Sequence, residues 1–333
     1  MSLADIIEYA RERGASDIHF TDRRPTLIRI DGELMPVGNQ DMNPQLLDAL
    51  ARELAGDRYD EFVDRGEIDF TYQAPHNRLR VNIFRQQGVP AAAMRLIPEK
   101  IPNFEELGIP PVVREFANLH QGLVLFTGPT GSGKSTTMAS LLNEINSSRA
   151  CHILTLEDPI EYIHQHKQSI VNQREIGHDS RTFANALRAA LRQDPDVILV
   201  GEMRDLETIA TAVTAAETGH LVLATLHTSS APATIDRIID VFPSHQQQQI
   251  RVQLADTLRG VVAQRLFPKK GEKGRVVACE ILVGTSAIKN LIREGKMHQI
   301  PGALETGSQH GMQTFEQALK KLTDMGLIDP VQF

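Results

Sequence analysis

One lysine of this sequence lies in a loop of glycine, serine and threonine, within the segment GLVLFTGPTGSGKSTT. Gly128, Gly133, Lys134 and Ser135 match the spacing G-x-x-x-x-G-K-S. In such a loop the glycines let backbone N–H groups approach phosphate oxygens, the lysine charge meets the terminal phosphates, and the serine hydroxyl can ligate Mg²⁺. A strand pattern before the loop and a helical pattern after it favour this interpretation over a chance match in a flexible turn. The expected nucleotide contacts are Gly128, Pro129, Thr130, Gly131, Ser132, Gly133, Lys134, Ser135 and Thr136.

Acidic residues follow the apolar runs HILTLE and DVILV. In an open parallel sheet the ligand lies beyond the carboxyl ends of the strands, where these acids would be. We expect Glu202 to hold Mg²⁺ or its water, and Glu161 to orient the attacking water as the general base. Glu157 and Asp158 are the alternative bases, although an aspartate directly before a proline is also typical of a turn.

His220 and His227 are the first and last residues of the segment HLVLATLH, whose middle is an apolar strand pattern. His227 stands at its far end, where the terminal phosphate would be, and we expect it to bond a phosphate or a catalytic carboxylate. His220 follows Gly219, so the residues alone favour a position next to a helix C-cap over a functional role.

The elements that must position these residues form two patterns. From Gly122 onward, continuous apolar strands alternate with helices, which predicts an α/β unit with a parallel sheet covered on both faces and right-handed crossovers. After about residue 244 the pattern becomes mainly helical, and we expect helices over the segments 246–267, 286–295 and 315–326.

A different pattern precedes this unit. An amphipathic helix over 3–10, a helix-rich stretch over 45–62 and five extended segments predict an α+β domain over 1–97. Residues 98–111 hold four prolines and are the predicted linker, which leaves 112–333 as the second domain.

Composition narrows the class of protein. The net charge of the 333 residues is -7, with both signs interspersed, which argues against nucleic acid as a partner. Cys151 and Cys279 stand far apart, which excludes a CxxC zinc site and fits a reducing cytosol. No window approaches the roughly 18 uncharged apolar residues of a membrane span, so we expect membrane association only through a partner.

The motifs carry a family resemblance that spans the chain. GPTGSGKSTT, LEDPIEY, LRQDPDVILVGEMRD and TGHLVLATLHT, in this order, resemble the Walker A, Asp-box, Walker B and His-box motifs of the type II/type IV secretion ATPases. GASDIHF and RLRVNIFRQ are similar to N-terminal segments of the same superfamily. AIKNLIREGKMHQI and HGMQTFEQAL resemble the C-terminal signature of the PilT-type pilus retraction motors, although Lys289 stands where arginine is expected.

The resemblance implies a hexameric, RecA-like ATPase with a PAS-like N-terminal domain. It implies that the protein binds ATP and Mg²⁺. It implies that Glu161 is the catalytic glutamate and Glu202 the Walker B acid, and that His220 and His227 form the His-box pair. It further implies that N-terminal arginines reach nucleotide across a subunit boundary, with Arg80 and Arg95 as the candidates.

For the whole protein, the resemblance implies a homo-hexamer that retracts a type IV pilus and supports twitching motility. Its partners would be an inner-membrane platform protein and other pilus ATPases. The protein would be located on the cytoplasmic side of the inner membrane. Assembly-type relatives carry a longer N-terminal region and a tetracysteine zinc insert, for which two cysteines cannot suffice. An assembly or secretion ATPase, a RecA-like nucleic-acid translocase and a nucleotide-gated regulator remain the alternatives.

Overall fold

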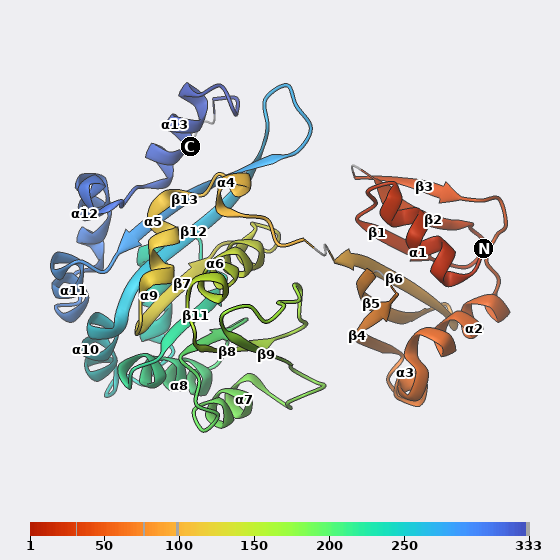
Figure 1. The fold of residues 1–333 in the computed structure, drawn as a ribbon, viewed down its shortest axis with the longest axis horizontal. Helices are drawn as coiled ribbons and strands as arrows, with labels where there is room; N and C mark the ends of the chain where they lie inside the picture. Colours follow the sequence, from red (N-terminus) through yellow and green to blue (C-terminus); the bar gives the residue numbers. More distant parts are fainter. Residues whose placement is uncertain (31, 76, 98–99, 331–333) are drawn as a thin grey trace. The chain divides into compact units, whose positions relative to one another are not determined.

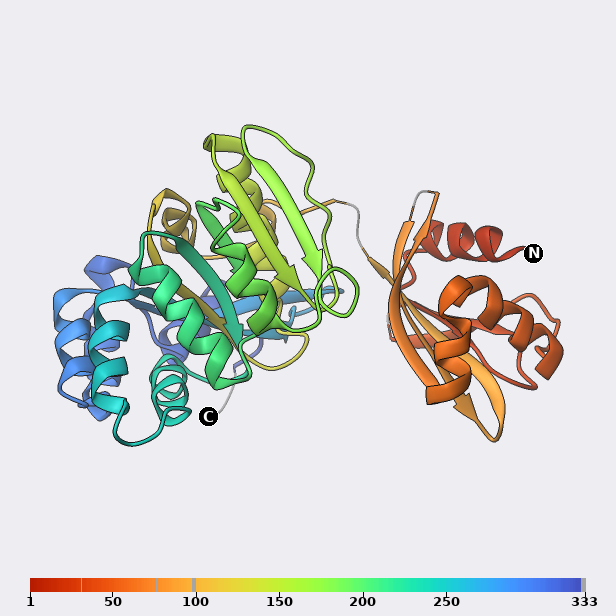
Figure 2. The same ribbon diagram turned by 90° about the horizontal axis from the view of Figure 1, so that it is seen from below.

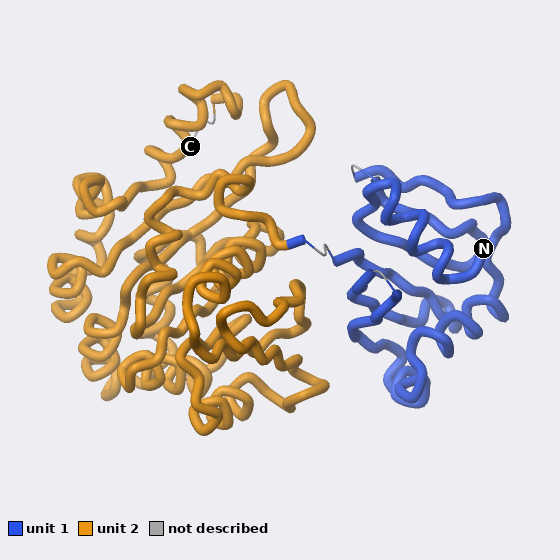
Figure 3. Tube along the Cα trace, viewed as in Figure 1, with its two compact units in different colours: residues 1–100 blue, residues 101–333 orange. Residues whose placement is uncertain are grey.

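The computed structural model describes residues 1–30, 32–75, 77–97 and 100–330. The chain divides into two compact units, residues 1–100 and 101–333, which Figure 3 colours separately. The predicted linker therefore straddles the division. Its first two residues, 98 and 99, lie outside the described residues, and residues 101–111 belong to the second unit.

The first unit is an antiparallel sheet with helices, as the α+β prediction expects (Figure 1). Its sheet has the order β3-β2-β1-β6-β5-β4. Helix α1 begins with a capping box, in which Ser2 and Asp5 satisfy each other's backbone amides, and it buries Leu3, Ile7 and Ala10. The elements are α1 Leu3–Glu12, β1 Asp17–Phe20, β2 Thr26–Ile30, β3 Glu33–Val37, α2 Pro44–Ala55, α3 Tyr59–Arg65, β4 Glu67–Ala74, β5 Asn77–Gln86 and β6 Val89–Ile97.

The second unit is built on a seven-stranded sheet of order β13-β12-β7-β11-β10-β8-β9, in which only β12 and β13 pair antiparallel. The first elements are α4 Phe104–Leu107, α5 Pro111–Glu115, β7 Gly122–Thr127, α6 Lys134–Ser148, β8 His152–Glu157, β9 Ile170–Glu175, α7 Phe183–Ala190 and β10 Val197–Val200. The remaining elements are α8 Leu206–Glu217, β11 Leu221–Leu226, α9 Ala231–Asp240, α10 Gln247–Thr257, β12 Leu258–Pro268, β13 Arg275–Val283, α11 Ser286–Arg293, α12 Ile300–Thr306 and α13 Phe315–Asp324.

Helices cover both faces of this sheet (Figures 1 and 2). Along β7, Val124 and Phe126 pack with α5 and α6 on one face, whereas Leu123 and Leu125 belong to the core beneath helices α7 to α12 on the other. This two-sided burial explains why the strands read as continuous apolar runs, and it confirms the predicted parallel α/β unit.

The helix predicted over 246–267 is wrong in its second half. Helix α10 ends at Thr257, and residues 258–268 form β12, which pairs with the edge of β7 opposite β11. A short apolar run does not distinguish a buried strand from a helix. Here the segment forms a strand because it pairs with the free hydrogen-bonding edge of β7. Strands β9 and β13 were also not predicted. Because β12 and β13 form a hairpin, the region after residue 244 contains two strands as well as helices.

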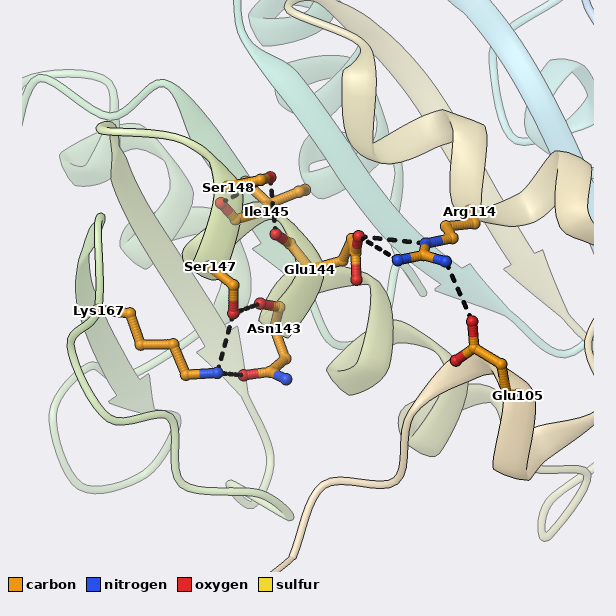
Figure 4. Close-up of polar contacts among 8 residues, drawn as sticks. All are labelled: Glu105, Arg114, Asn143, Glu144, Ile145, Ser147, Ser148 and Lys167. Atoms are coloured by element: carbon orange, nitrogen blue, oxygen red, sulfur yellow. Dashed lines mark hydrogen bonds and ion pairs between the residues drawn. The ribbon is translucent and has the colours of Figure 1, made fainter.

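The first residues of the second unit form hydrogen bonds with α6, the helix that follows the glycine-rich loop (Figure 4). Arg114 donates to Glu144 of α6 at 2.8 Å and to Glu105 of α4 at 3.1 Å. The hydroxyl of Ser140, also on α6, donates to the carbonyl of Pro102 at 2.6 Å. Much of the segment predicted as a linker is therefore part of the second unit's packed structure.

Among the described residues, no helix has the length and apolar character that crossing a membrane would require.

Candidate active site

The glycine-rich loop connects buried strand β7 to helix α6, as the spacing predicts. Gly128, Gly131 and Gly133 have φ angles of 138°, 77° and 90°, which favour glycine over residues with a side chain. A Cβ atom at Gly128 would lie 2.3 Å from the carbonyl oxygen of Gln264 on β12. Gly128 therefore allows the loop to lie directly against β12.

Lys134 begins helix α6 and folds back over the loop. Its Nζ donates to the carbonyls of Gly128 at 2.8 Å and Pro129 at 3.0 Å. An ammonium group has three donors, so one remains for a phosphate oxygen. Burial lowers the pKa of Lys134, while the carboxylates of Glu202 and Glu161 act in the opposite direction.

One cavity of the second unit gathers predicted residues of the loop and of three strand exits at the carboxyl ends of the strands. From the loop and α6 it is lined by Thr130, Gly131, Lys134 and Ser135. From the exits of β8, β10 and β11 it is lined by Glu157, Asp158, Glu161, Glu202, Thr225 and His227. The other predicted loop residues, Gly128, Pro129, Ser132, Gly133 and Thr136, shape the loop without lining this cavity.

Glu202 and His227 meet within the cavity. The Nε2 of His227 lies 2.9 Å from Oε1 of Glu202, and Arg204 pairs with the same carboxylate oxygen. The Glu202 side chain is only 17% exposed, so its charge is shared with a ring nitrogen and a guanidinium rather than with solvent. Asp205, in contrast, caps helix α8 by accepting from the amide of Thr208 at 2.8 Å.

Glu157 is an acid of the cavity with a raised pKa. Burial raises its pKa to about 7, although hydrogen bonds from Thr155 at 2.6 Å and from Gln173 at 3.1 Å favour the charged form. Glu161, four residues on, is exposed at the cavity. Glu157 is half-buried, whereas Glu161 and Asp158 both have the solvent access that a water-orienting base needs.

Several side chains of the cavity were not predicted from the sequence. Tyr162 forms a hydrogen bond with the hydroxyl of Thr136 at 3.0 Å, and His164 and Phe183 also line the cavity. Burial lowers the pKa of His164 to about 4, so its ring is neutral at neutral pH. The cavity position of Tyr162 and His164 depends on the loop after β8, for which the sequence gives no periodic signal.

His220 directly precedes β11, at the amino end of the strand, whereas the cavity lies at the carboxyl ends. Its Nδ1 lies 3.0 Å from the carbonyl oxygen of Ala215 in the last turn of α8, and Gly219 follows that helix with a φ of 113°. This is the cap-adjacent position that the residues alone predict. Within one chain His220 does not join His227.

Arg80 and Arg95 belong to the first unit, where they face each other across β5 and β6. Arg80 lies 3.6 Å from Asp69, and Arg95 donates to Asp17 at 2.9 Å. Both side chains are exposed, at 46% and 69%. Their contact with a nucleotide remains a prediction.

Comparison with known proteins places this geometry in a family. The Type II/IV secretion system protein family matches residues 1–326. The type IV pilus retraction ATPase PilT of Pseudomonas aeruginosa is 46% identical, over 98% of this chain and 96% of its own length. A twitching motility protein of Neisseria gonorrhoeae is also 46% identical, over 91% of this chain and 82% of its own length.

A crystal structure of the pilus retraction motor PilT with bound ADP superimposes with a TM-score of 0.92 and 49% identity, covering 98% of this chain and 94% of that one. The sequence match and the superposition both extend over the two units, so the relationship is not confined to the glycine-rich loop. This chain belongs to the type II/IV secretion system protein family.

Proposed function

We propose that this protein is an ATP-driven motor that retracts a type IV pilus. It hydrolyses ATP to ADP and phosphate, and it works as a homo-hexamer on the cytoplasmic side of the inner membrane, where it acts on a pilus platform protein. The observation that carries the proposal is the cavity that brings Lys134, Glu161, Glu202 and His227 together in a chain similar to a retraction ATPase over nearly its whole length.

The cavity fits a nucleotide bound through its phosphates. Lys134 lines the cavity and its Nζ uses two of its three donors on loop carbonyls, so one donor is left for a phosphate oxygen. Loop amides and Lys134 would hold the phosphates, with the positive end of α6 behind them. Nucleotide binding is supported by the ADP in the similar PilT structure.

Mg²⁺ would be held by Ser135 and by Glu202, directly or through water. Mg²⁺ usually binds through one or two protein ligands together with phosphates and waters. Among the described residues, no group of three or more His, Cys, Asp or Glu is arranged to hold a metal ion. When bound, the ion would neutralise charge on the phosphates, while His227 keeps the Glu202 carboxylate oriented.

The chemistry assigned to the chain itself is positioning and proton transfer. Glu161 would orient the attacking water and accept its proton, since it is an exposed acid of the cavity, and Asp158, which is also exposed there, is the alternative base. Arg80 and Arg95 would complete a neighbouring subunit's site in the ring. This division of roles makes hydrolysis depend on assembly.

Complementation of a deletion strain tests the proposal and separates retraction from assembly. Wild type should restore twitching, whereas Lys134→Ala should leave cells with surface pili that do not retract. Lys320→Ala, which changes an exposed lysine on α13 outside the cavity, should complement and is the matched control. A deletion strain without pili would instead show an assembly ATPase and overturn the proposal.

A further inference from the structure

A buried carboxylate without an assigned role lies on β13, the end strand of the sheet. Glu280 is only 9% exposed, and its Oε1 accepts the backbone N–H of Ala231 at 2.7 Å. Burial raises the pKa of Glu280, and the backbone amides of Ala231 and Phe315 act in the opposite direction. These amides belong to the first residues of α9 and α13, so one acid serves the starts of two helices.

Helix α9 begins directly after the loop that carries His227. The loop, residues 227–230, is held to β7 because the Thr127 hydroxyl donates to the carbonyl of Thr228 at 2.6 Å. It is held to α9 because the hydroxyls of Thr228 and Thr234 lie 2.7 Å apart. His227 is four residues before Ala231, so the start of α9 limits where its ring can lie.

The second helix is fixed on the other side of the same acid. Gln313 pairs with Ile281 through backbone hydrogen bonds of 2.9 and 3.1 Å, on the edge of β13 away from β12. Phe315 then begins α13, and the guanidinium of Arg265 lies 4.8 Å from the centre of its ring. Glu280 is therefore enclosed between α9, α13 and the sheet.

We propose that Glu280 is a positioning residue for hydrolysis: by holding the first turn of α9 it keeps His227 in contact with Glu202. This rests on the proposed function, in which Glu202 helps to hold Mg²⁺ and His227 orients Glu202. The side chain of Ser230 caps the amide of Ala233, and Glu280 accepts from Ala231, so the two acceptors satisfy different amides of the same turn. Without Glu280 the amide of Ala231 has lost its acceptor, and the loop before it can shift.

The test compares purified variants by steady-state ATPase kinetics and by binding of a non-hydrolysable ATP analogue. Glu280→Ala should lower kcat on the order of ten- to a hundredfold, because small misplacement of a catalytic group is costly, with little change in analogue affinity. Glu280→Gln keeps an oxygen for Ala231 and should recover much of the rate. Leu319→Ala, which removes buried carbon from α13 without touching α9, should leave kcat near wild type.

A double variant separates a positioning role from general destabilisation. If Glu280 acts through His227, then Glu280→Ala combined with His227→Ala should be no slower than His227→Ala alone. Multiplied losses, an equal loss in Leu319→Ala, or normal turnover in Glu280→Ala would overturn the inference. Normal turnover in His227→Ala would instead refute the site assignment itself, so the two failures are distinguishable.

Discussion

Glu157→Gln should change how the stability of the second unit depends on pH. The carboxyl titrates near 4.5 in the unfolded chain and at about 7 in the folded protein. Below the first value it is protonated in both states, and above the second it is ionised in both. Between them the folded state keeps a proton that the unfolded chain has lost, so rising pH lowers the free energy of unfolding. Each pH unit is worth about 1.4 kcal/mol, so the whole loss is about 3 kcal/mol.

Glutamine imitates the protonated acid, because its Oε1 can still accept from Thr155 and Gln173. The variant should therefore lack this component of the pH dependence and gain about 3 kcal/mol on wild type between about pH 4 and pH 8. Urea unfolding followed by circular dichroism, without nucleotide, measures the difference. Glu316→Gln, which removes an exposed carboxyl on α13, is the control and should keep the wild-type dependence. Parallel curves for wild type and Glu157→Gln would refute the reasoning.

Three further predictions concern the motor. Glu161→Gln and Glu202→Gln keep the size of the side chain, so both should bind ATP and hydrolyse it about a hundredfold more slowly or worse; normal turnover in Glu161→Gln would make another acid the base. Rings mixed from Lys134→Ala and Arg80→Ala subunits should deviate from the activity expected of simple dilution, because each site would draw on two subunits; activity following dilution would contradict a shared site. Alanine at three polar positions of α11, Lys289, Asn290 and Arg293, should spare ATPase activity and abolish retraction in cells. Retraction at normal speed in this variant would refute the prediction.

The glycine-rich loop was predictable because its chemistry is local. The spacing from Gly128 to Ser135 fixes the turn, the amide groups and the lysine without reference to the rest of the chain. Glu161, Glu202 and His227 were predictable for a related reason. Each follows an apolar strand, and the carboxyl ends of parallel strands meet at one edge of the sheet.

Contacts between distant segments were not predictable in this way. Gln173 bonds Glu157 only because β9 adds to the edge of β8, and the short polar run of β9 gave no strand signal. Strand β12 was mistaken for a helix because its central apolar run, residues 261–263, is short and buried on both faces of the sheet, so it carries no alternation typical of a half-exposed strand. Glu280 was missed because its partner amides lie 49 residues before it and in the C-terminal helix.

The attachment of residues 101–115 to α6 has a consequence for dividing the chain into fragments. Phe104 and Ile109 are 6% and 7% exposed and belong to the same core as α6. A fragment begun at residue 112, the border that the prolines suggest, would lose both side chains, each worth roughly 1.5–3 kcal/mol of burial. It would also lose the ion pair between Arg114 and Glu105. A fragment begun at residue 101 keeps these contacts, so the ATPase unit is better isolated from the end of the first sheet than from the end of the proline-rich segment.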